Sequence, residues 1–241
     1  MKVAINQSNY ISWKGYFDMI QSVDLFILYD DVQYTRRDWR NRNKIKTPHG
    51  LKWLTIPVNV KGKYFQKIKD TTVNDKRWNI DHLRAIKSSY AKAKYFKDVF
   101  PIIEDLYLTA NYTTISEINF HFILAICKYL DIKTKIVFSS DYDLSEEKKT
   151  DRLIDICLQA KATEYISGPL AKDYINKQLF DKANIGLTWM NYDNYPEYSQ
   201  LYGDFVHKVT ILDLLFNCGK SSINFINKRK NYANQHKKIQ L

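Results

Sequence analysis

Apolar and polar positions along the first thirty residues predict two short strands with a helix between them. Lys2–Ile5 and Leu25–Tyr29 have strand-like composition, and the second is an unbroken apolar run that is too short for a buried helix. Trp13–Val23, between them, is the expected helix. A strand, a helix and a second strand in this order form the unit from which parallel sheets are built.

The stretch from Leu51 to Leu130 predicts a hairpin followed by helices. Leu51–Asn59 and Tyr64–Ile68 are strand-like, and the turn Lys61–Gly62 would join them as a hairpin. Thr114 and Glu117 have the spacing of a helix capping box. The expected helices are Lys76–Ala93, Tyr95–Ala110, in which Pro101 would introduce a kink or break, and Thr113–Leu130.

Strands and helices alternate again after residue 130. The expected elements are strand Thr134–Phe138, helix Lys148–Ala160, strand Glu164–Ile166, helical turns in Ala171–Lys182, strand Ile185–Met190, and helices over Val206–Asn217 and from Ser222 onward. No long linker rich in Gly, Ser or Pro divides the chain. We therefore predict one α/β domain over residues 1–227. Its expected fold is Rossmann-like: a mostly parallel sheet flanked by helices, with a helical insertion at about residues 76–130.

Composition adds a strong positive charge to this picture. The net charge is +11, while 45% of residues are hydrophobic and 26% are charged, which are the values of a globular protein. Such an excess favours acidic partners, for example nucleic acid or nucleotide-linked substrates. Part of it lies in a basic C-terminal tail, residues 228–241, which holds five Lys and Arg residues and no acidic residue.

Targeting segments and common cofactor motifs are not recognisable in the sequence. No apolar run is long enough to span a bilayer, and the N-terminus lacks the apolar stretch of a signal peptide, so we expect a cytoplasmic protein. The three cysteines lie far apart in apolar segments and are expected to be reduced. The five histidines share no metal-ligand spacing, and neither a Walker motif nor a dinucleotide-binding glycine motif occurs.

Leu25–Asn43 holds the densest cluster of candidate chemistry. Asp30 and Asp31 follow the apolar strand, and the end of such a strand is where open α/β sheets place their ligands. The pair is a candidate site for a Mg²⁺ ion that bridges a diphosphate, or one acid is a general base; a purely structural role is equally consistent. The basic run that follows suits phosphate groups, and consists of Arg36, Arg37, Arg40 and Arg42 with Asp38, Trp39, Asn41 and Asn43 among them.

Two further loops are expected at the same edge of the sheet. Gln7, Asn9 and Tyr10 occupy the turn after the first strand, where they can meet a phosphate or a sugar, although Asn and Ser also favour turns for local reasons. Ser167 and Gly168 follow a later strand, and no G-x-S-x-G elbow marks Ser167 as a nucleophile, so substrate contact is the expected role. Tyr174 is a candidate wall of the same pocket.

Several of these motifs, taken in order, resemble the WbqC-like family. The matching segments are 7–13 (QSNYISW), 30–33 (DDVQ), 37–43 (RDWRNRN), 53–58 (WLTIPV), 165–168 (YISG) and 210–219 (TILDLLFNCG). The likeness therefore covers most of the chain. In one departure, the His-Gln-Pro run that the family usually shows after the first strand is Asn6-Gln7-Ser8 here, which removes a group that titrates near neutral pH.

The resemblance implies a role in surface-polysaccharide synthesis, such as that of the O-antigen of lipopolysaccharide. We expect a transferase that adds an acyl or aminoacyl group to a nucleotide-linked amino sugar. The candidate catalytic residues are Asp30, Asp31 and Gln7, and the candidate substrate contacts are Asn9, Tyr10, Trp13, Arg37, Asp38, Arg40, Asn41, Arg42, Asn43, Ser167, Gly168 and Tyr174. Two alternatives stay open: a nucleotidylyl or adenylate-forming enzyme, and an RNA-binding module, for instance one for an aminoacyl-tRNA that donates the acyl group.

Overall fold

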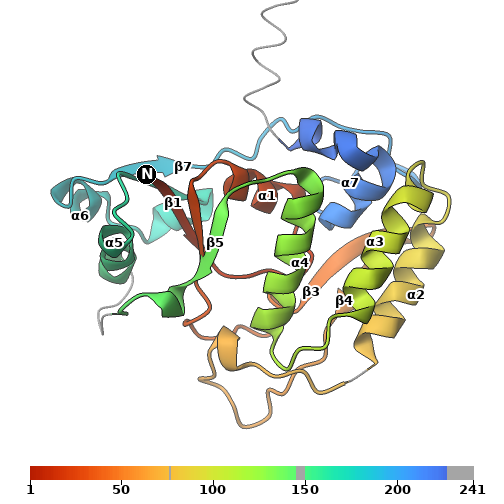
Figure 1. Ribbon diagram of the computed structural model, residues 1–241, viewed down its shortest axis with the longest axis horizontal. Helices are drawn as coiled ribbons and strands as arrows, with labels where there is room; N and C mark the ends of the chain where they lie inside the picture. The colour runs from red at the N-terminus through yellow and green to blue at the C-terminus, as the bar shows by residue number, and fades with distance from the viewer. Residues whose placement is uncertain (76, 145–149, 227–241) are drawn as a thin grey trace, which may run out of the picture.

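A five-stranded parallel sheet organises the protein (Figure 1). The structure is a computed structural model, and it describes residues 1–75, 77–144 and 150–226. The strands follow the order β5-β2-β1-β6-β7, and every neighbouring pair is parallel. Their bounds are β1 Lys2–Asn6, β2 Leu25–Leu28, β5 Lys135–Phe138, β6 Glu164–Ser167 and β7 Gly186–Trp189. This arrangement confirms the predicted Rossmann-like α/β fold.

Successive side chains of a strand point to opposite faces, and both faces of this sheet are buried. Ala4 of β1 and Phe26 of β2 pack on one face against helix α1, Lys14–Gln21. Val3 and Ile27 pack on the other face against helices α5, Thr150–Gln159, and α6, Lys177–Lys182. The sheet therefore separates two hydrophobic cores, and Figure 1 shows α5 and α6 at one end of the molecule.

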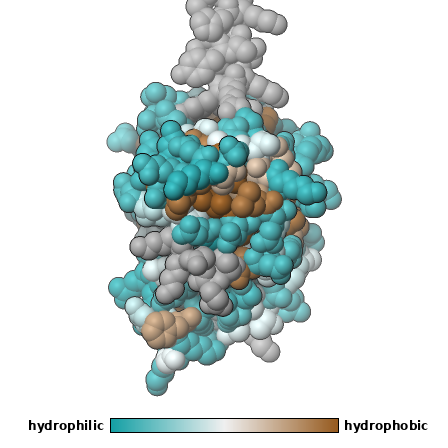
Figure 2. Space-filling model, turned by 90° about the vertical axis from the view of Figure 1, so that its left-hand side faces the viewer, coloured by the Kyte–Doolittle hydropathy of each residue, from teal (hydrophilic) through white to brown (hydrophobic). Residues whose placement is uncertain are grey.

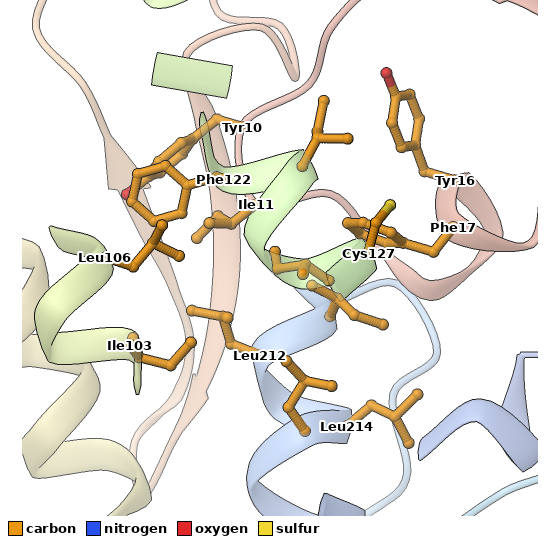
Figure 3. Close-up of a cluster of buried hydrophobic side chains, with 14 of the residues drawn as sticks. Tyr10, Ile11, Tyr16, Phe17, Ile103, Leu106, Phe122, Cys127, Leu212 and Leu214 are labelled. Carbon is orange, nitrogen blue, oxygen red and sulfur yellow. The ribbon is translucent and has the colours of Figure 1, made fainter. Parts of the chain in front are cut away.

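The larger core continues into a helical lobe between β2 and β5 in chain order. Its helices are α2 Trp78–Tyr90, α3 Phe96–Leu108 and α4 Ile115–Leu130, and α7 Ile211–Cys218 joins them from the end of the chain. Figure 3 shows side chains from α3, α4 and α7 converging with Ile11 and Phe17 from the first strand–helix unit. The predicted capping box is present at Thr114 and Glu117, and α3 continues through Pro101.

The predicted hairpin is wrong in its choice of strands. Strand β4, Gly50–Thr55, pairs antiparallel with β3, Arg42–Thr47, and not with the segment around Tyr64–Ile68. Every second residue of β3 from Arg42 to Lys46 is basic, although Lys46 is buried, so the alternation of a strand is hidden within a run of charges. Gly50, at φ 101°, supports the tight turn that joins the two strands.

Most of the remaining predicted elements agree with the structure. The helix predicted from Ser222 onward is described only as part of a 3-10 helix, Gly219–Phe225, and its continuation lies outside the described residues, as do residues 76, 148 and 149 of two other predicted helices. Two helix limits also differ. Residues 206–209 are not helical, because α7 begins only after its N-cap residue Thr210. The segment after Gly168 begins with a 3-10 helix, Pro169–Asp173, before α6. The basic tail, residues 228–241, lies outside the described residues. Within the described part of the chain, no helix is long and apolar enough to cross a membrane.

Hydrophilic and apolar areas share the end of the molecule where α5 and α6 lie. Figure 2 views this end and shows an apolar band between hydrophilic areas. Leu158 of α5 is one of the exposed apolar residues of the protein.

Candidate functional site

A cavity of about 680 Å³ opens where the strand order of the sheet reverses. The chain places β2 and β5 on one side of β1, and β6 and β7 on the other. The register between β1 and β6 consists of two pairs near their N-terminal ends, Lys2 with Glu164 and Val3 with Tyr165. Loops that leave the C-terminal ends of these strands therefore diverge, and ligands of open α/β sheets bind in this crevice.

The cavity is lined by segments that are far apart in the sequence. The loop after β1 contributes Gln7, Asn9 and Trp13, and the loop after β6 contributes Ser167 and Gly168. The rest of the wall comes from the basic segment, β3, the start of α5, the end of the 3-10 helix after β6 and the segment after β7. These contribute, among others, Arg40, Asn43, Arg152, Tyr174, Tyr192 and Lys208. A volume of this size suits a ligand as large as a nucleotide.

The charged lining residues are all cationic. Arg40, Arg152 and Lys208 line the cavity, and no Asp or Glu occurs among its described lining residues. Seven of the lining residues are aromatic: Trp13, Tyr16, Tyr29, Trp39, Tyr165, Tyr174 and Tyr192. Positive charge attracts anions into a cleft with low-dielectric walls, and aromatic rings supply faces for sugars or bases. The lining therefore combines positive charge with aromatic surface.

Arg40 is the most deeply buried of these cations. Only 8% of the residue is exposed, and one terminal nitrogen of its guanidinium lies 3.5 Å from a carboxylate oxygen of Asp38. The Nε and Nη1 atoms are buried without a hydrogen-bond partner. Buried polar groups in folded proteins are nearly always hydrogen-bonded, so a guanidinium with unused donors in a cavity wall has capacity for an anionic oxygen.

Asp30 lies behind this wall rather than in it. Its two carboxylate oxygens accept hydrogen bonds from the Ser8 amide at 2.8 Å and from the Ser116 hydroxyl at 2.5 Å. Burial raises the pKa of Asp30, although these hydrogen bonds and the charge of Arg40 act in the opposite direction. The acid therefore holds the loop after β1 against α4 and contributes negative potential near Arg40.

Asp31 points to a different set of partners. Lys69 contacts one carboxylate oxygen at 2.5 Å, and the Ser139 hydroxyl donates to the other at 2.7 Å. Although burial acts to raise it, the pKa of Asp31 is lowered overall by the hydrogen bonds and charges of its partners. Neither acid is a lining residue, and the two carboxylates bind separate sets of protein partners, so they do not form a shared site in the cavity wall. No group of three or more His, Cys, Asp or Glu residues that could hold a metal ion occurs in the described part of the chain.

The loop after β1 is held rigidly at the cavity. The Asn6 side-chain oxygen accepts from the Gln7 amide at 2.9 Å, and the Tyr16 hydroxyl donates to the Gln7 carbonyl at 3.0 Å. Asn119 of α4 donates to the Ser8 hydroxyl at 2.9 Å. The side-chain oxygen of Asn9 is buried without a partner, which leaves an acceptor available in the lining.

Tyr10 is placed in the hydrophobic core instead of the cavity. Figure 3 shows its ring beside Phe122, whereas the Tyr16 hydroxyl points away from the cluster. The Tyr10 hydroxyl lies 2.9 Å from the His82 ring and 2.5 Å from the Tyr107 hydroxyl. Its role in this structure is to join the loop after β1 to helices α2 and α3.

Four further candidates of the basic segment also lie outside the lining. Asn41 donates to the Ile56 carbonyl at 2.8 Å, and Arg42 donates to the Arg37 carbonyl. Asp38 accepts from the Trp39 amide at 2.7 Å. These contacts shape the turn that presents Arg40. Asn43 does line the cavity, but its side chain is also bound to the Tyr10 and Ile11 carbonyls.

Sequence reasoning missed several residues that the fold brings to the cavity. Tyr29 directly follows β2, and ligands of open α/β sheets bind at the ends of such strands, so its position in the sequence could have identified it. Burial raises the pKa of Tyr29, while a hydrogen bond and the positive charge of Arg152 act to lower it, so Arg152 lies close to Tyr29. Tyr192 and Lys208 carry no local signal, since they reach the cavity only through the irregular segment after β7.

The chain belongs to the WbqC-like protein family. The family model matches residues 7–225, which include both loops of the cavity and the basic segment. A protein of Mycobacterium tuberculosis that carries the name Uncharacterized protein Rv1507c is 48% identical over 225 residues, which are 93% of this chain and 97% of that protein. No solved structure matches the chain.

Proposed function

We propose that this protein is a transferase of surface-polysaccharide biosynthesis whose cavity binds a nucleotide-linked amino sugar. The observation that carries the proposal is the buried Arg40 guanidinium with unused donors in the wall of an aromatic, cationic cavity. Its location at the reversal of the sheet supports the same conclusion, because α/β folds bind nucleotides there.

The ligand class follows from the chemistry of the lining. Phosphate oxygens match a guanidinium with free donors, and three cations without a lining carboxylate favour a group with more than one negative charge. Amide and hydroxyl groups of Asn9 and Ser167 suit sugar hydroxyls. Aromatic faces, such as that of Trp13, suit the rings of a sugar or a base.

The proposed reaction is the transfer of an acyl or aminoacyl group to the amine of the bound sugar. The amine nitrogen attacks the carbonyl carbon of an activated donor, the bond between that carbon and its carrier breaks, and the proton that the nitrogen loses passes to the departing carrier or to water. The described lining holds no His, Cys, Asp or Glu to take this proton. The protein's contribution is therefore the binding and orientation of the two reactants, which alone lowers a barrier substantially.

The test is calorimetric titration of the full chain with a panel of nucleoside diphosphate sugars. We expect saturable binding by the wild type, and a loss of about tenfold or more in affinity for Arg40→Gln, because a charge-assisted contact to phosphate is worth about 1.5–3 kcal/mol. Arg84→Gln is the matched control, since Arg84 is exposed on α2 and pairs with Asp81. Absence of binding by the wild type, or equal effects of the two substitutions, contradicts the proposal.

A further inference from the structure

Two tryptophans stand partly exposed at one side of the cavity. Trp39 is 40% exposed and Trp53 is 39% exposed, which is unusual for such large apolar side chains. Trp39 belongs to the cavity lining, while Trp53 lies on β4 of the hairpin. Their ring centroids are 5.5 Å apart with an angle of 39° between the planes, so the second ring supports the first.

The surrounding charges hold this pair in place. The Arg42 guanidinium lies 4.1 Å from the centre of the Trp53 ring, and the Lys44 ammonium lies 4.7 Å from it. The side chains of Arg42 and Lys44 share one face of β3, because residues two apart on a strand point the same way. The ring of Trp53 is thus occupied by cations, which leaves Trp39 as the ring that meets the cavity.

The backbone of Trp39 is fixed from both sides. Its carbonyl accepts from the Tyr10 amide at 3.0 Å, and its amide donates to the Asp38 carboxylate at 2.7 Å. Arg37, two residues earlier, has the left-handed φ of 57°, which a non-glycine residue adopts only where contacts compensate for it. An exposed indole is therefore presented on a rigid turn, next to the buried cation Arg40.

From this arrangement we infer that Trp39 is the stacking surface for the nucleobase of the bound nucleotide. The inference rests on the proposed function and assigns the base to the mouth of the cavity, with the phosphates at Arg40. Trp53 and Arg42 are positioning residues that keep the Trp39 ring at its angle. Stacking on a ring face tolerates every base, so we expect affinity to depend on the presence of a base much more than on its identity.

The experiment compares ligands with and without a base on wild type and variants. We expect Trp39→Ala to weaken the binding of a nucleoside diphosphate sugar by about 5- to 150-fold, the range found for loss of base stacking, and to leave the binding of the corresponding sugar 1-phosphate unchanged. Trp39→Phe retains a ring face and is expected to recover most of the affinity. Phe65→Ala is the matched control, because Phe65 is 82% exposed and lies outside the lining.

Indole fluorescence supplies a second measurement. Stacking of a base on Trp39 is expected to quench the emission of the wild type on titration with the nucleotide, and Trp39→Phe is expected to bind with this quenching reduced. Thermal unfolding of each variant verifies that the fold is kept.

The outcomes separate the two proposals. If the wild type binds nucleotide sugars and Trp39→Ala binds them as tightly as Phe65→Ala does, the base site is wrong and the proposed function stands. If the wild type binds none of the nucleotide sugars, both are wrong. If a sugar 1-phosphate loses as much affinity as the nucleotide sugar in Trp39→Ala, Trp39 shapes the cavity and does not stack a base.

Discussion

At the scale of single residues, Arg40 and Arg42 of the basic segment have different surroundings. Arg40 enters the cavity wall with unused donors, while Arg42 is engaged by the Trp53 ring and the Arg37 carbonyl. The sequence showed that phosphate-binding side chains were concentrated here, but it could not show which of them point inward. That choice depends on the turn before β3, and the turn is fixed by contacts to Tyr10 and Ile56 from other parts of the chain.

The acid pair illustrates the same limit. The two adjacent aspartates after a strand were consistent with a metal site, a general base or a structural pair. In the structure, each carboxylate is bound by its own protein partners outside the cavity lining. The serines that bind Asp30 and Asp31 come from α4 and from the residue after β5, about 85 and 110 residues away. No local sequence pattern predicts partners that lie so far away in the chain.

Asp30→Ala is expected to lower the free energy of unfolding by about 2–3 kcal/mol, because the Ser8 amide and the Ser116 hydroxyl lose their buried acceptor. Chemical denaturation of the variant measures this loss. Asp81→Ala is the control, since the exposed ion pair of Asp81 with Arg84 contributes at most about 1 kcal/mol. Similar losses for both variants would show that the buried hydrogen bonds of Asp30 are unimportant for stability.

His82 predicts a specific dependence of stability on pH. Burial lowers its pKa to about 4 from the ordinary value of 6.5. The unfolded chain therefore binds a proton between pH 6.5 and 4 that the folded chain does not, and the free energy of unfolding falls as the pH falls through this window. Relative to His82→Gln, the wild type is expected to lose about 2 kcal/mol between pH 7.5 and 4.5.

Urea denaturation of the two proteins across this range checks the His82 prediction. Other titrating groups are common to both proteins and cancel in the difference. A constant difference in stability from pH 7.5 to 4.5 would show that His82 titrates alike in the folded and unfolded chains.

At the scale of elements, regular secondary structure was predictable wherever a hydrophobic period was visible. The inner strands β1, β2 and β6 are largely buried and appear as short apolar runs, and the start of α4 is marked in the sequence by its capping box. The hairpin failed because Arg42, Lys44 and Lys46 conceal the alternation of β3. A strand that carries charges on one face resembles a basic loop in sequence until its partner strand is known.

Thr114→Ala tests how far the cap of α4 supports the site. The substitution removes the acceptor for the Glu117 amide and is expected to cost about 1 kcal/mol of stability, measured by thermal or chemical unfolding. Thr113→Ala, at the neighbouring exposed threonine that is not the capping residue, is expected to cost less. Helix α4 carries Ser116 and Asn119, which donate hydrogen bonds to Asp30 and Ser8. Fraying of the first turn of α4 is therefore expected to weaken the contacts that hold the loop after β1.

At the scale of the whole molecule, two cores separated by one sheet contribute to a single cavity. Trp13 and Tyr16 come from the side of the larger core, whereas Tyr165 and Leu153 come from the side of the smaller core. The α/β class and the helical insertion followed from the order of elements. The sequence did not predict that the segment after β7 lies beside the loop after β1, because this contact forms only when the sheet has assembled.

Removal of residues 228–241 is expected to leave both the thermal unfolding midpoint and the binding of nucleotide sugars unchanged. The larger core includes Ile226, which is fully buried, and Lys208 is the last lining residue in the described part of the chain. The deletion takes away five basic residues, so any RNA binding that weakens steeply with salt should be reduced. Loss of nucleotide-sugar binding on deletion, with RNA binding retained, would contradict the assignment of the site.

The brief pairing of β1 with β6 suggests how the arrival of a ligand could be detected. The two strands share two register pairs near their N-terminal ends, and the Tyr165 hydroxyl donates to the Ile5 carbonyl at 3.4 Å. Beyond these contacts, the loops that follow the strands carry Gln7 and Ser167 on the cavity wall. A ligand that contacts both loops would link them, and slower amide exchange in the two loops on binding would reveal this link.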